Sequence, residues 1–290
     1  MKAAITGGTG FIGKQVVCQL EAMGYEVTLI GRSDIKGETS LLRQKLNNAS
    51  LVINLAGAPI IDKWTDYHKK NIYHSRIHTT RNLVYAMDPK STRLFISASA
   101  IGIYSEEGVQ TESKFTYAYD YLALVCNDWE SEAMRLSNNI RTVIFRFGVV
   151  LGKGGALQKM LPLFKYGLGG IIGNGEQAYS WVHIKDVVEA ISFVISNPEC
   201  KGVYNITSPN PVSNKTFTEA LAGKLKRKAI LKVPAFVLKM KYGEGANVLL
   251  TGQTVIPERL LAQGFSFQFP EIDGALENII NQNSDLQKLS

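Results

Sequence analysis

Gly7, Gly10 and Gly13 recur at intervals of three residues near the start of the chain and can bring the backbone close to a phosphate. They follow a short apolar run, Lys2–Ile5, and precede residues 14–23, whose apolar members recur at helical spacing. Glycine permits a tight strand-to-helix turn, and the first N–H groups of a helix attract anions. The pattern therefore predicts a dinucleotide cofactor site, although such a turn can also simply join a strand to a helix. The residues predicted to line this turn are Gly7, Thr9, Gly10, Phe11, Ile12 and Gly13.

The next predicted strand, Glu26–Ile30, is followed by Arg32 and Ser33. At this position a carboxylate would accept a hydrogen bond from the ribose 2′-OH of NAD, whereas a guanidinium suits the 2′-phosphate of NADP. Asp34 is the nearest acid and lies beyond the strand end. We therefore expect Arg32 and Ser33 to bind the cofactor, with NADP(H) preferred over NAD(H). The alternative is that Arg32 is an exposed loop residue.

Two further predicted strands, 51–57 and 93–99, end in small or hydroxyl-bearing residues. Small residues at the carboxyl end of a parallel strand leave room for a ligand that crosses the sheet. Ser99 could donate a hydrogen bond to a substrate, or it could cap the following turn or contact only the cofactor. The remaining residues predicted to contact the cofactor are Leu55, Ala56, Gly57 and Ser97.

Strand and helix patterns alternate through the first two-thirds of the chain. The expected helices are 14–23, 39–46, 66–87 and 121–136, and a fifth expected strand is 141–147. This alternation predicts an α/β fold with a Rossmann-type, doubly wound parallel sheet. We assign residues 1–205 to a cofactor-binding domain and 206–290 to a smaller mixed C-terminal domain on the substrate side. Glycines crowd residues 148–178, which we expect to form a loop-rich excursion toward the substrate.

The bulk composition excludes several classes of protein. Of the 290 residues, 45% are hydrophobic and 20% are charged. No apolar stretch reaches the length of a membrane span, and the first expected strand leaves no room for a targeting peptide. The three cysteines are widely separated, form no metal-binding pattern and suit a reducing compartment. We therefore expect a cytoplasmic protein with no metal and no membrane partner.

The net charge of +7 comes partly from basic clusters at residues 69–70 and 224–228. No nucleic-acid-binding motif accompanies them, and cations also suit helix ends, so we expect no nucleic-acid partner. A basic balance also suits a polyanionic cofactor. Helices on the flank of such a sheet often pair, which makes a homodimer possible.

Several segments, in their order along the chain, resemble the extended short-chain dehydrogenase/reductases, the superfamily of nucleotide-sugar epimerases. These segments are Thr6–Gly13, Asn54–Gly57, Ser97–Tyr104 and Trp181–Val187. Others are similar to an atypical branch labelled "epimerase family protein", namely Asn54–Pro59, Leu122–Glu130, Phe147–Gly152 and Gly252–Pro257. The resemblance implies an NADP(H)-binding Rossmann domain and a small C-terminal domain of unknown function, and it brings no substrate.

The superfamily's chemistry implies a tyrosine acid or base with a lysine four residues later on the same helix face. No lysine of this chain has a tyrosine at that spacing, and alignment on Glu130 puts Leu122 and Cys126 at the two positions. Tyr121 is a displaced catalytic candidate, rotated by about 100° around the helix; alternatively it is an ordinary half-buried aromatic. Ser99 aligns with the superfamily's catalytic hydroxyl. Cys126 has no histidine or lysine partner in the pattern and is typical of an inert packing residue.

A second departure concerns the arginine that grips the substrate phosphate in nucleotide-sugar enzymes, because Tyr179 stands at that position. A phenol cannot replace a permanently charged, bidentate guanidinium, although Lys165 or Arg146 could substitute. We therefore expect a small-molecule substrate that is not a nucleotide-diphosphate sugar. His183 and Asp186 permit an acid–base interpretation, but a structural role at the start of a helix is favoured.

Two functions remain open. The first is an NADP(H)-dependent oxidoreductase or epimerase-like enzyme that lacks the Tyr-x-x-x-Lys pair. The second is a non-catalytic NADP(H)-binding sensor or partner-binding module, which the missing pair favours. The glycine-rich region and the second domain, which can enclose a small ligand, favour the first.

Overall fold

The computed structural model describes residues 1–136, 139–229 and 231–287. Within those ranges, six parallel strands form the central sheet in the order β11-β6-β4-β3-β1-β2. These strands are β1 (Lys2–Thr6), β2 (Glu26–Ile30), β3 (Ala49–Asn54), β4 (Leu94–Ala100), β6 (Arg141–Phe147) and β11 (Gly202–Ile206). The order reverses direction at β1, as in a doubly wound sheet, and the predicted Rossmann-type α/β fold is confirmed.

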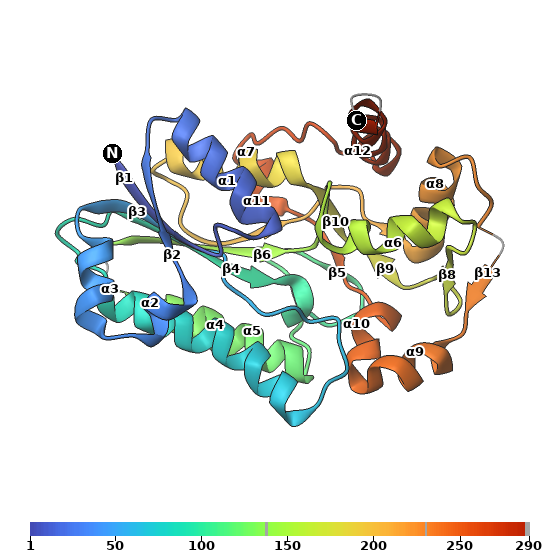
Figure 1. Ribbon diagram of the computed structural model, residues 1–290, viewed down its shortest axis with the longest axis horizontal. Coiled ribbons are helices and arrows are strands. Elements are labelled where there is room, and N and C mark those ends of the chain that lie inside the picture. Colours follow the sequence, from blue (N-terminus) through green and yellow to red (C-terminus); the bar gives the residue numbers. More distant parts are fainter. Residues whose placement is uncertain (137–138, 230, 288–290) are drawn as a thin grey trace.

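Helices cover both faces of this sheet (Figure 1). One face carries α1 (Phe11–Ala22) and α7 (Ile184–Ser196), and the other carries α3 (Thr39–Leu46), α4 (Asp66–Ala86) and α5 (Tyr121–Ala133). Successive strand residues supply the two cores alternately, because side chains of a strand point to opposite faces. Ile5 and Ile96 join the core under α1 and α7, whereas Ala4 and Phe95 join the core under α3 and α4. The strands are therefore apolar on both sides, as buried parallel strands are.

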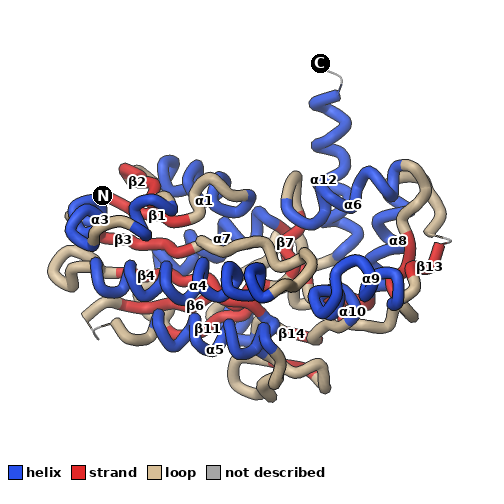
Figure 2. The backbone as a smooth tube through the Cα atoms, turned by 60° about the horizontal axis from the view of Figure 1, so that its bottom comes forward, coloured by secondary structure: helices blue, strands red, loops and turns tan. Residues whose placement is uncertain are grey.

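A smaller lobe lies beside the sheet at the end where the strands terminate (Figure 2). Its own core includes Leu157, Phe164, Trp181, Phe217 and Leu276. The helices of this lobe are α6 (Gly155–Lys165), α8 (Asn214–Lys224), α9 (Ala235–Tyr242), α10 (Asn247–Leu250) and α12 (Ile272–Gln287). Its short strands are β8 (Gly170–Ile172), β9 (Ala178–Tyr179), β12 (Val212–Ser213) and β13 (Leu231–Val233).

The expectation that residues 148–178 are loop-rich is wrong in part. This stretch contains the eleven-residue helix α6 and the strand β7 (Val149–Leu151), which pairs in parallel with β10 (Trp181–His183). Leu157, Leu161 and Phe164 recur at helical spacing and pack into the core of the smaller lobe. The dense glycines on either side of α6 concealed this pattern in the sequence.

The division at residues 205 and 206 does not follow the packing. The last residue of β11 is Ile206, and the chain later returns to the larger lobe. There β14 (Thr254–Val255) pairs in parallel with β5 (Val109–Gln110), and α11 (Glu258–Ala262) packs beside β11. Leu260 and Phe265 enter the core under α1 and α7. The smaller lobe is therefore built from two inserted segments and the C-terminal helix α12 rather than from the C-terminus alone.

Among the helices of the described ranges, none combines the length and apolar character that crossing a bilayer requires.

Candidate functional site

Four neighbouring strands end together at one edge of the central sheet. The last residues of β2, β1 and β3 lie in register, since Ile30 pairs with Thr6 and Thr6 with Asn54. Asn54 pairs in turn with Ser97, three residues before the end of β4. The predicted cofactor residues lie at or just beyond these strand ends, so the topology brings them to a single edge. In open parallel sheets, the carboxyl edge at the point where strand order reverses is where ligands bind.

The turn between β1 and α1 is packed so tightly that it leaves no room for a side chain at Gly7 or Gly13. Gly7 has a φ of +69°, and a Cβ on it would lie 2.7 Å from the Leu55 carbonyl oxygen. A Cβ on Gly13 would overlap the carbonyl oxygen of Gly7. The Gly10 N–H donates to that same oxygen at 2.9 Å, and no side chain caps α1. The first N–H groups of α1 thus lie at the carboxyl edge without intrahelical partners.

A chain of buried hydrogen bonds holds the ends of β1 and β3 against α4. The Thr6 hydroxyl donates to Asn54 Oδ1 at 2.6 Å, and Asn54 Nδ2 donates to Thr80 Oγ1 at 2.8 Å. The Thr80 hydroxyl donates to the backbone carbonyl of Arg76 at 2.7 Å. These contacts fix the loop that begins at Leu55, where Ala56 and Gly57 were predicted to meet the cofactor.

Arg32 and Ser33 begin a short helix, α2 (Arg32–Lys36), and both are exposed. The Asp34 carboxylate accepts the Gly31 N–H at 2.7 Å and pairs with Lys45 Nζ at 2.8 Å. The Lys45 hydrogen bond, followed by the Gly31 bond, lowers the pKa of Asp34. Because the Asp34 carboxylate is bonded to Gly31 and Lys45, the exposed charged group just beyond β2 is the Arg32 guanidinium.

The Ser99 hydroxyl is directed toward α5 and not toward open space. It is 2% exposed and donates to Glu130 Oε1 at 2.6 Å. Ser97 is also buried, and its hydroxyl makes a long contact of 3.3 Å with the Ala98 carbonyl. The proposed catalytic role of Ser99 stays a prediction, and its hydroxyl already has a charged partner.

Glu130 and Arg146 form a buried, bidentate ion pair behind Ser99. Arg146 Nε and Nη2 each donate to one Glu130 oxygen at 2.7 Å. Arg146 Nη1 reaches the Tyr104 hydroxyl at 2.7 Å, and that hydroxyl donates to Asn205 Oδ1 at 2.7 Å. Arg146, 4% exposed, is therefore committed to this network and is not free to grip a substrate phosphate. Beyond the presence of both charges, no pattern in the sequence indicated this network.

The residues at and beside the missing Tyr-x-x-x-Lys positions are poorly suited to exchange protons near neutral pH. The Tyr121 hydroxyl donates to the Lys69 carbonyl at 2.6 Å, and burial raises its pKa. Cys126 is 4% exposed, and burial raises the pKa of its thiol to about 12. Cys126 is therefore a packing residue, whereas a catalytic role for Tyr121 stays a prediction.

His183 and Asp186 have structural partners. His183 Nδ1 accepts the Lys185 N–H at 3.1 Å as the N-cap of α7. The Asp186 carboxylate accepts the N–H groups of Gln268 and Phe269 at 2.7 and 3.1 Å. Asp186 thereby ties the returning C-terminal segment to α7, in agreement with the favoured structural interpretation.

Tyr179, at the position of the phosphate-gripping arginine, stacks on Phe217 with the ring centroids 4.3 Å apart. Burial raises the pKa of its phenol. The ring therefore packs between β9 and α8. Lys165, the other residue considered as a substitute for the arginine, is exposed at the end of α6.

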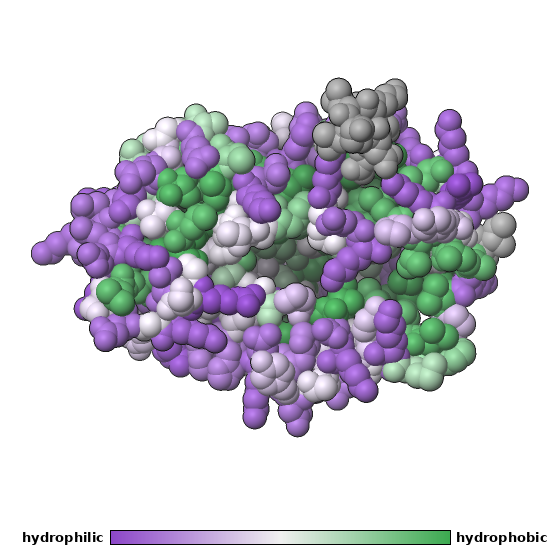
Figure 3. All heavy atoms as spheres, viewed as in Figure 1, coloured by the Kyte–Doolittle hydropathy of each residue, from purple (hydrophilic) through white to green (hydrophobic). Residues whose placement is uncertain are grey.

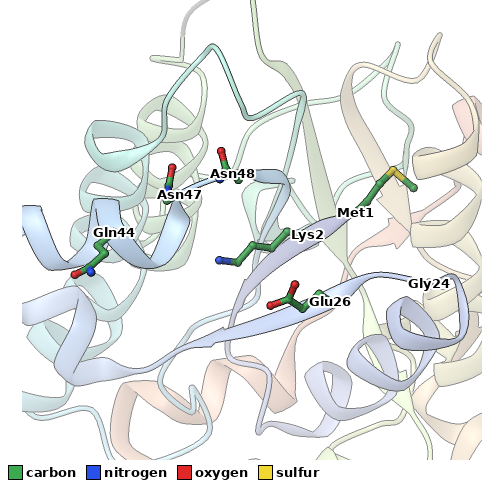
Figure 4. A pocket seen from close by; sticks show the side chains of 7 residues that line it. All are labelled: Met1, Lys2, Gly24, Glu26, Gln44, Asn47 and Asn48. Carbon is green, nitrogen blue, oxygen red and sulfur yellow. The ribbon is translucent and has the colours of Figure 1, made fainter.

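A pocket of about 370 Å³ lies where the N-termini of α1, α6 and α7 meet. Thr9, Gly10 and Phe11 line one side, and the lining also includes Lys14 and Lys185. Figure 3 shows the molecular face hollowed between the two lobes. A larger pocket of about 510 Å³ lies at the amino ends of β1 and β2 (Figure 4). That edge is opposite to the one at which parallel sheets bind ligands, so we assign it no function.

Comparison with known proteins identifies the class. Residues 3–207 match the model of the NAD dependent epimerase/dehydratase family, and residues 233–279 match a domain of unknown function, DUF1731. Because the first match covers more than half of the chain, the chain belongs to the NAD dependent epimerase/dehydratase family. The resemblance seen in the sequence, including the C-terminal domain, is confirmed.

Its relatives carry the label "epimerase family protein". Epimerase family protein SDR39U1 homolog, chloroplastic, from Arabidopsis thaliana is 38% identical over 302 residues, which cover 97% of this chain and 87% of that protein. Epimerase family protein YfhF from Bacillus subtilis is 34% identical over 297 residues, covering 97% and 98%.

Solved structures agree with the fold. The crystal structure of human epimerase family protein SDR39U1 (isoform2) with NADPH has a TM-score of 0.88 at 32% identity and covers 96% of this chain and 99% of that one. MoeE5 in complex with UDP-glucose and NAD has a TM-score of 0.80 at 20% identity, with 100% of both chains covered. The second likeness shows the fold alone.

Proposed function

We propose that this protein binds NADP(H) along the carboxyl edge of its central sheet, with the pyrophosphate at the N-terminus of α1. The observation that carries the proposal is the Gly7–Gly13 turn, where a Cβ on Gly7 or Gly13 would meet backbone atoms. The absence of a side chain at Gly7 and Gly13 lets this turn pack against the backbone and brings the start of α1 to the carboxyl edge of the sheet. Its uncapped helical N–H groups supply the donors that a phosphate requires.

The preference for NADP(H) over NAD(H) rests on the end of β2. Arg32 is exposed there, and Asp34 is occupied by Gly31 and Lys45, so a 2′-phosphate meets a free cation. The SDR39U1 relative of known structure contains NADPH, which supports the same cofactor here. Lys14 and Lys185 add positive charge beside the turn.

When bound, the cofactor would supply hydride transfer at its nicotinamide ring. The residues of this chain would orient the ring and the substrate, since the Tyr-x-x-x-Lys pair is missing. We further propose that the substrate is a small molecule other than a nucleotide-diphosphate sugar. The support is that Tyr179 stacks on Phe217 and Arg146 is paired with Glu130, so neither offers a guanidinium to a diphosphate.

A specific observation also supports the alternative, a non-catalytic NADP(H)-binding sensor or partner-binding module. Ser99, Tyr121 and Cys126 each have a buried partner or a raised pKa, and these are the groups that the sequence offered for proton transfer. A protein that only senses the cofactor needs none of them.

Two measurements test these functions in order. Calorimetric titration of the purified protein with NADPH is expected to give a dissociation constant in the micromolar range or below, and absence of binding would refute both functions. A screen of carbonyl compounds for NADPH oxidation then separates them. Turnover supports the enzyme, whereas no turnover together with NADPH-dependent binding of a partner protein supports the sensor.

A further inference from the structure

Arg76 is a buried cation beside the cofactor edge. It lies on α4, is 8% exposed, and donates from Nη2 to the Ala58 carbonyl at 3.0 Å and from Nη1 to the Ile72 carbonyl at 3.1 Å. A Cβ built on Gly57 would lie 3.0 Å from Arg76 Nη2, so the guanidinium lies directly against the Gly57–Ala58 turn. The guanidinium also lies over the Trp129 ring, whose centroid is 5.3 Å from its central carbon.

The charge of Arg76 has no acidic counterpart in the described ranges. The arginines that form ion pairs there are Arg81, Arg135 and Arg146, with Glu132 or Glu130, and the other ion pairs involve lysines. A buried charge without a counter-ion is costly, and an arginine cannot escape this cost by losing its proton near neutral pH. Carbonyl dipoles and the indole ring offset part of the cost and leave the net charge in place. A permanent negative charge brought close to this guanidinium would complete the compensation.

The position of Arg76 limits where that negative charge can come from. The Gly57–Ala58 turn is two residues from Leu55, whose carbonyl oxygen abuts Gly7 of the phosphate-binding turn. In NADP(H), the permanent negative charges are the 2′-phosphate and the pyrophosphate. The 2′-phosphate is assigned above to Arg32, beyond β2 at the other side of β1. The pyrophosphate remains, which the proposed function places at the turn that packs against Leu55.

We propose that Arg76 is a cofactor-positioning residue, whose buried guanidinium is neutralised by the pyrophosphate of bound NADP(H). This inference rests on the proposed function. It adds a role for α4 that the glycine turn does not supply, because the dinucleotide is held by a fixed charge from the β3 side as well as by the N-terminus of α1. Since NADPH and NADH share the pyrophosphate, Arg76 contributes affinity without contributing to the choice between them.

The test compares Arg76→Gln and Arg76→Lys in the full chain. Glutamine keeps amide donors for the two carbonyl groups and removes the charge, whereas lysine keeps the charge. Calorimetric titration with NADPH, and with NADH, is expected to show at least a tenfold loss of affinity for both nucleotides in Arg76→Gln, by the same factor. Arg76→Lys is expected to recover most of that loss. Arg81→Gln is the matched control, because Arg81 lies on the same helix and is paired with Glu132 at 2.6 Å.

Three outcomes overturn the inference. Arg76→Gln could bind NADPH as the wild type does, Arg76→Lys could lose as much affinity as Arg76→Gln, or the loss could fall on NADPH alone. The second outcome would mean that Arg76 only braces the loop. Failure of the proposed function would look different, because the wild type itself would then bind neither nucleotide. Titration of the wild type detects that result independently of any variant.

Discussion

The superfamily's catalytic groups correspond in this chain to positions at or beside Ser99, Tyr121 and Cys126. The surroundings of each side chain hold its proton in place and do not favour its transfer. The Ser99 hydroxyl donates to Glu130, which is already held by Arg146. The Tyr121 hydroxyl donates to a backbone carbonyl, and the Cys126 thiol is buried. At the scale of residues, the candidate site resembles a binding surface more than a proton relay.

Replacing Ser99 by alanine tests the structural side of this interpretation. The variant loses a hydrogen bond to a buried carboxylate, so we expect the free energy of unfolding to fall by about 1–3 kcal/mol. NADPH affinity should be unchanged. Urea denaturation followed by circular dichroism measures the first quantity, and titration measures the second.

Ser97→Ala is the matched control for this variant, because the Ser97 hydroxyl is equally buried and makes only a long contact with a carbonyl. Its loss of stability should be smaller. If Ser99→Ala instead kept the stability of the wild type but abolished turnover of an identified substrate, Ser99 would return to a catalytic role.

At the scale of elements, two strands and one helix could be predicted from the sequence to the residue. β2, β6 and α3 have the expected bounds because apolar periodicity and flanking glycines mark them clearly. Such features depend on local chemistry, which a single sequence contains.

Features that depend on distant contacts could not be predicted. Nothing local to Thr254–Val255 indicates that it pairs with β5, which lies far earlier in the chain. In the sequence alone, Arg76 is typical of an exposed charge, and its burial follows only from the packing of α4. The available indication was its helical spacing from the apolar residues Ile72 and Leu83, which are also buried. The counter-charge of Arg146 likewise comes from another element.

The N-cap of α7 leads to a prediction about pH. Burial, followed by repulsion from Lys185, lowers the pKa of His183 from 6.5 to about 4. Between these values the unfolded chain binds more protons than the folded protein, so folding stability falls as the pH falls from about 6.5 to about 4. Through this group the loss is at most about 3 kcal/mol, and it levels off below pH 4.

His183→Asn separates this contribution from that of the carboxylates. Asparagine offers an oxygen to the Lys185 N–H and does not titrate, so helix α7 keeps a cap. The variant should lose less stability than the wild type between pH 6.5 and pH 4, measured by urea denaturation at several pH values. Identical pH slopes for the two proteins would show that His183 does not cause the dependence.

At the scale of the whole molecule, the two lobes are not independent in sequence. The chain leaves the larger lobe after β11, builds part of the smaller lobe, and returns with β14 and α11. Arg259 donates to the Val203 carbonyl at 2.7 Å and so clamps the returning segment onto β11. The β11 edge of the sheet, which lies at the opposite side from β2, is thereby closed by residues that follow the first family match.

This arrangement predicts the behaviour of a chain ending at residue 207. Such a chain lacks Leu260 and Phe265, whose burial contributes roughly 2–3 kcal/mol each, and it exposes the core under α7. We expect it to lose cooperative thermal unfolding, monitored by circular dichroism. Leu260→Ala in the full chain should fold and lose about 2–5 kcal/mol. A cooperative transition of the short chain would show that the returning segment is dispensable.

The most direct test of the central claim is calorimetric titration of the wild type and Arg32→Ala with NADPH and with NADH. If the carboxyl edge binds NADP(H), with Arg32 at the 2′-phosphate, the wild type binds NADPH at least tenfold more tightly than NADH. Arg32→Ala then removes that preference and leaves NADH affinity unchanged. Equal affinities in the wild type, or a preference that survives in Arg32→Ala, would contradict the assignment of Arg32, and no binding of either nucleotide would contradict the cofactor site itself.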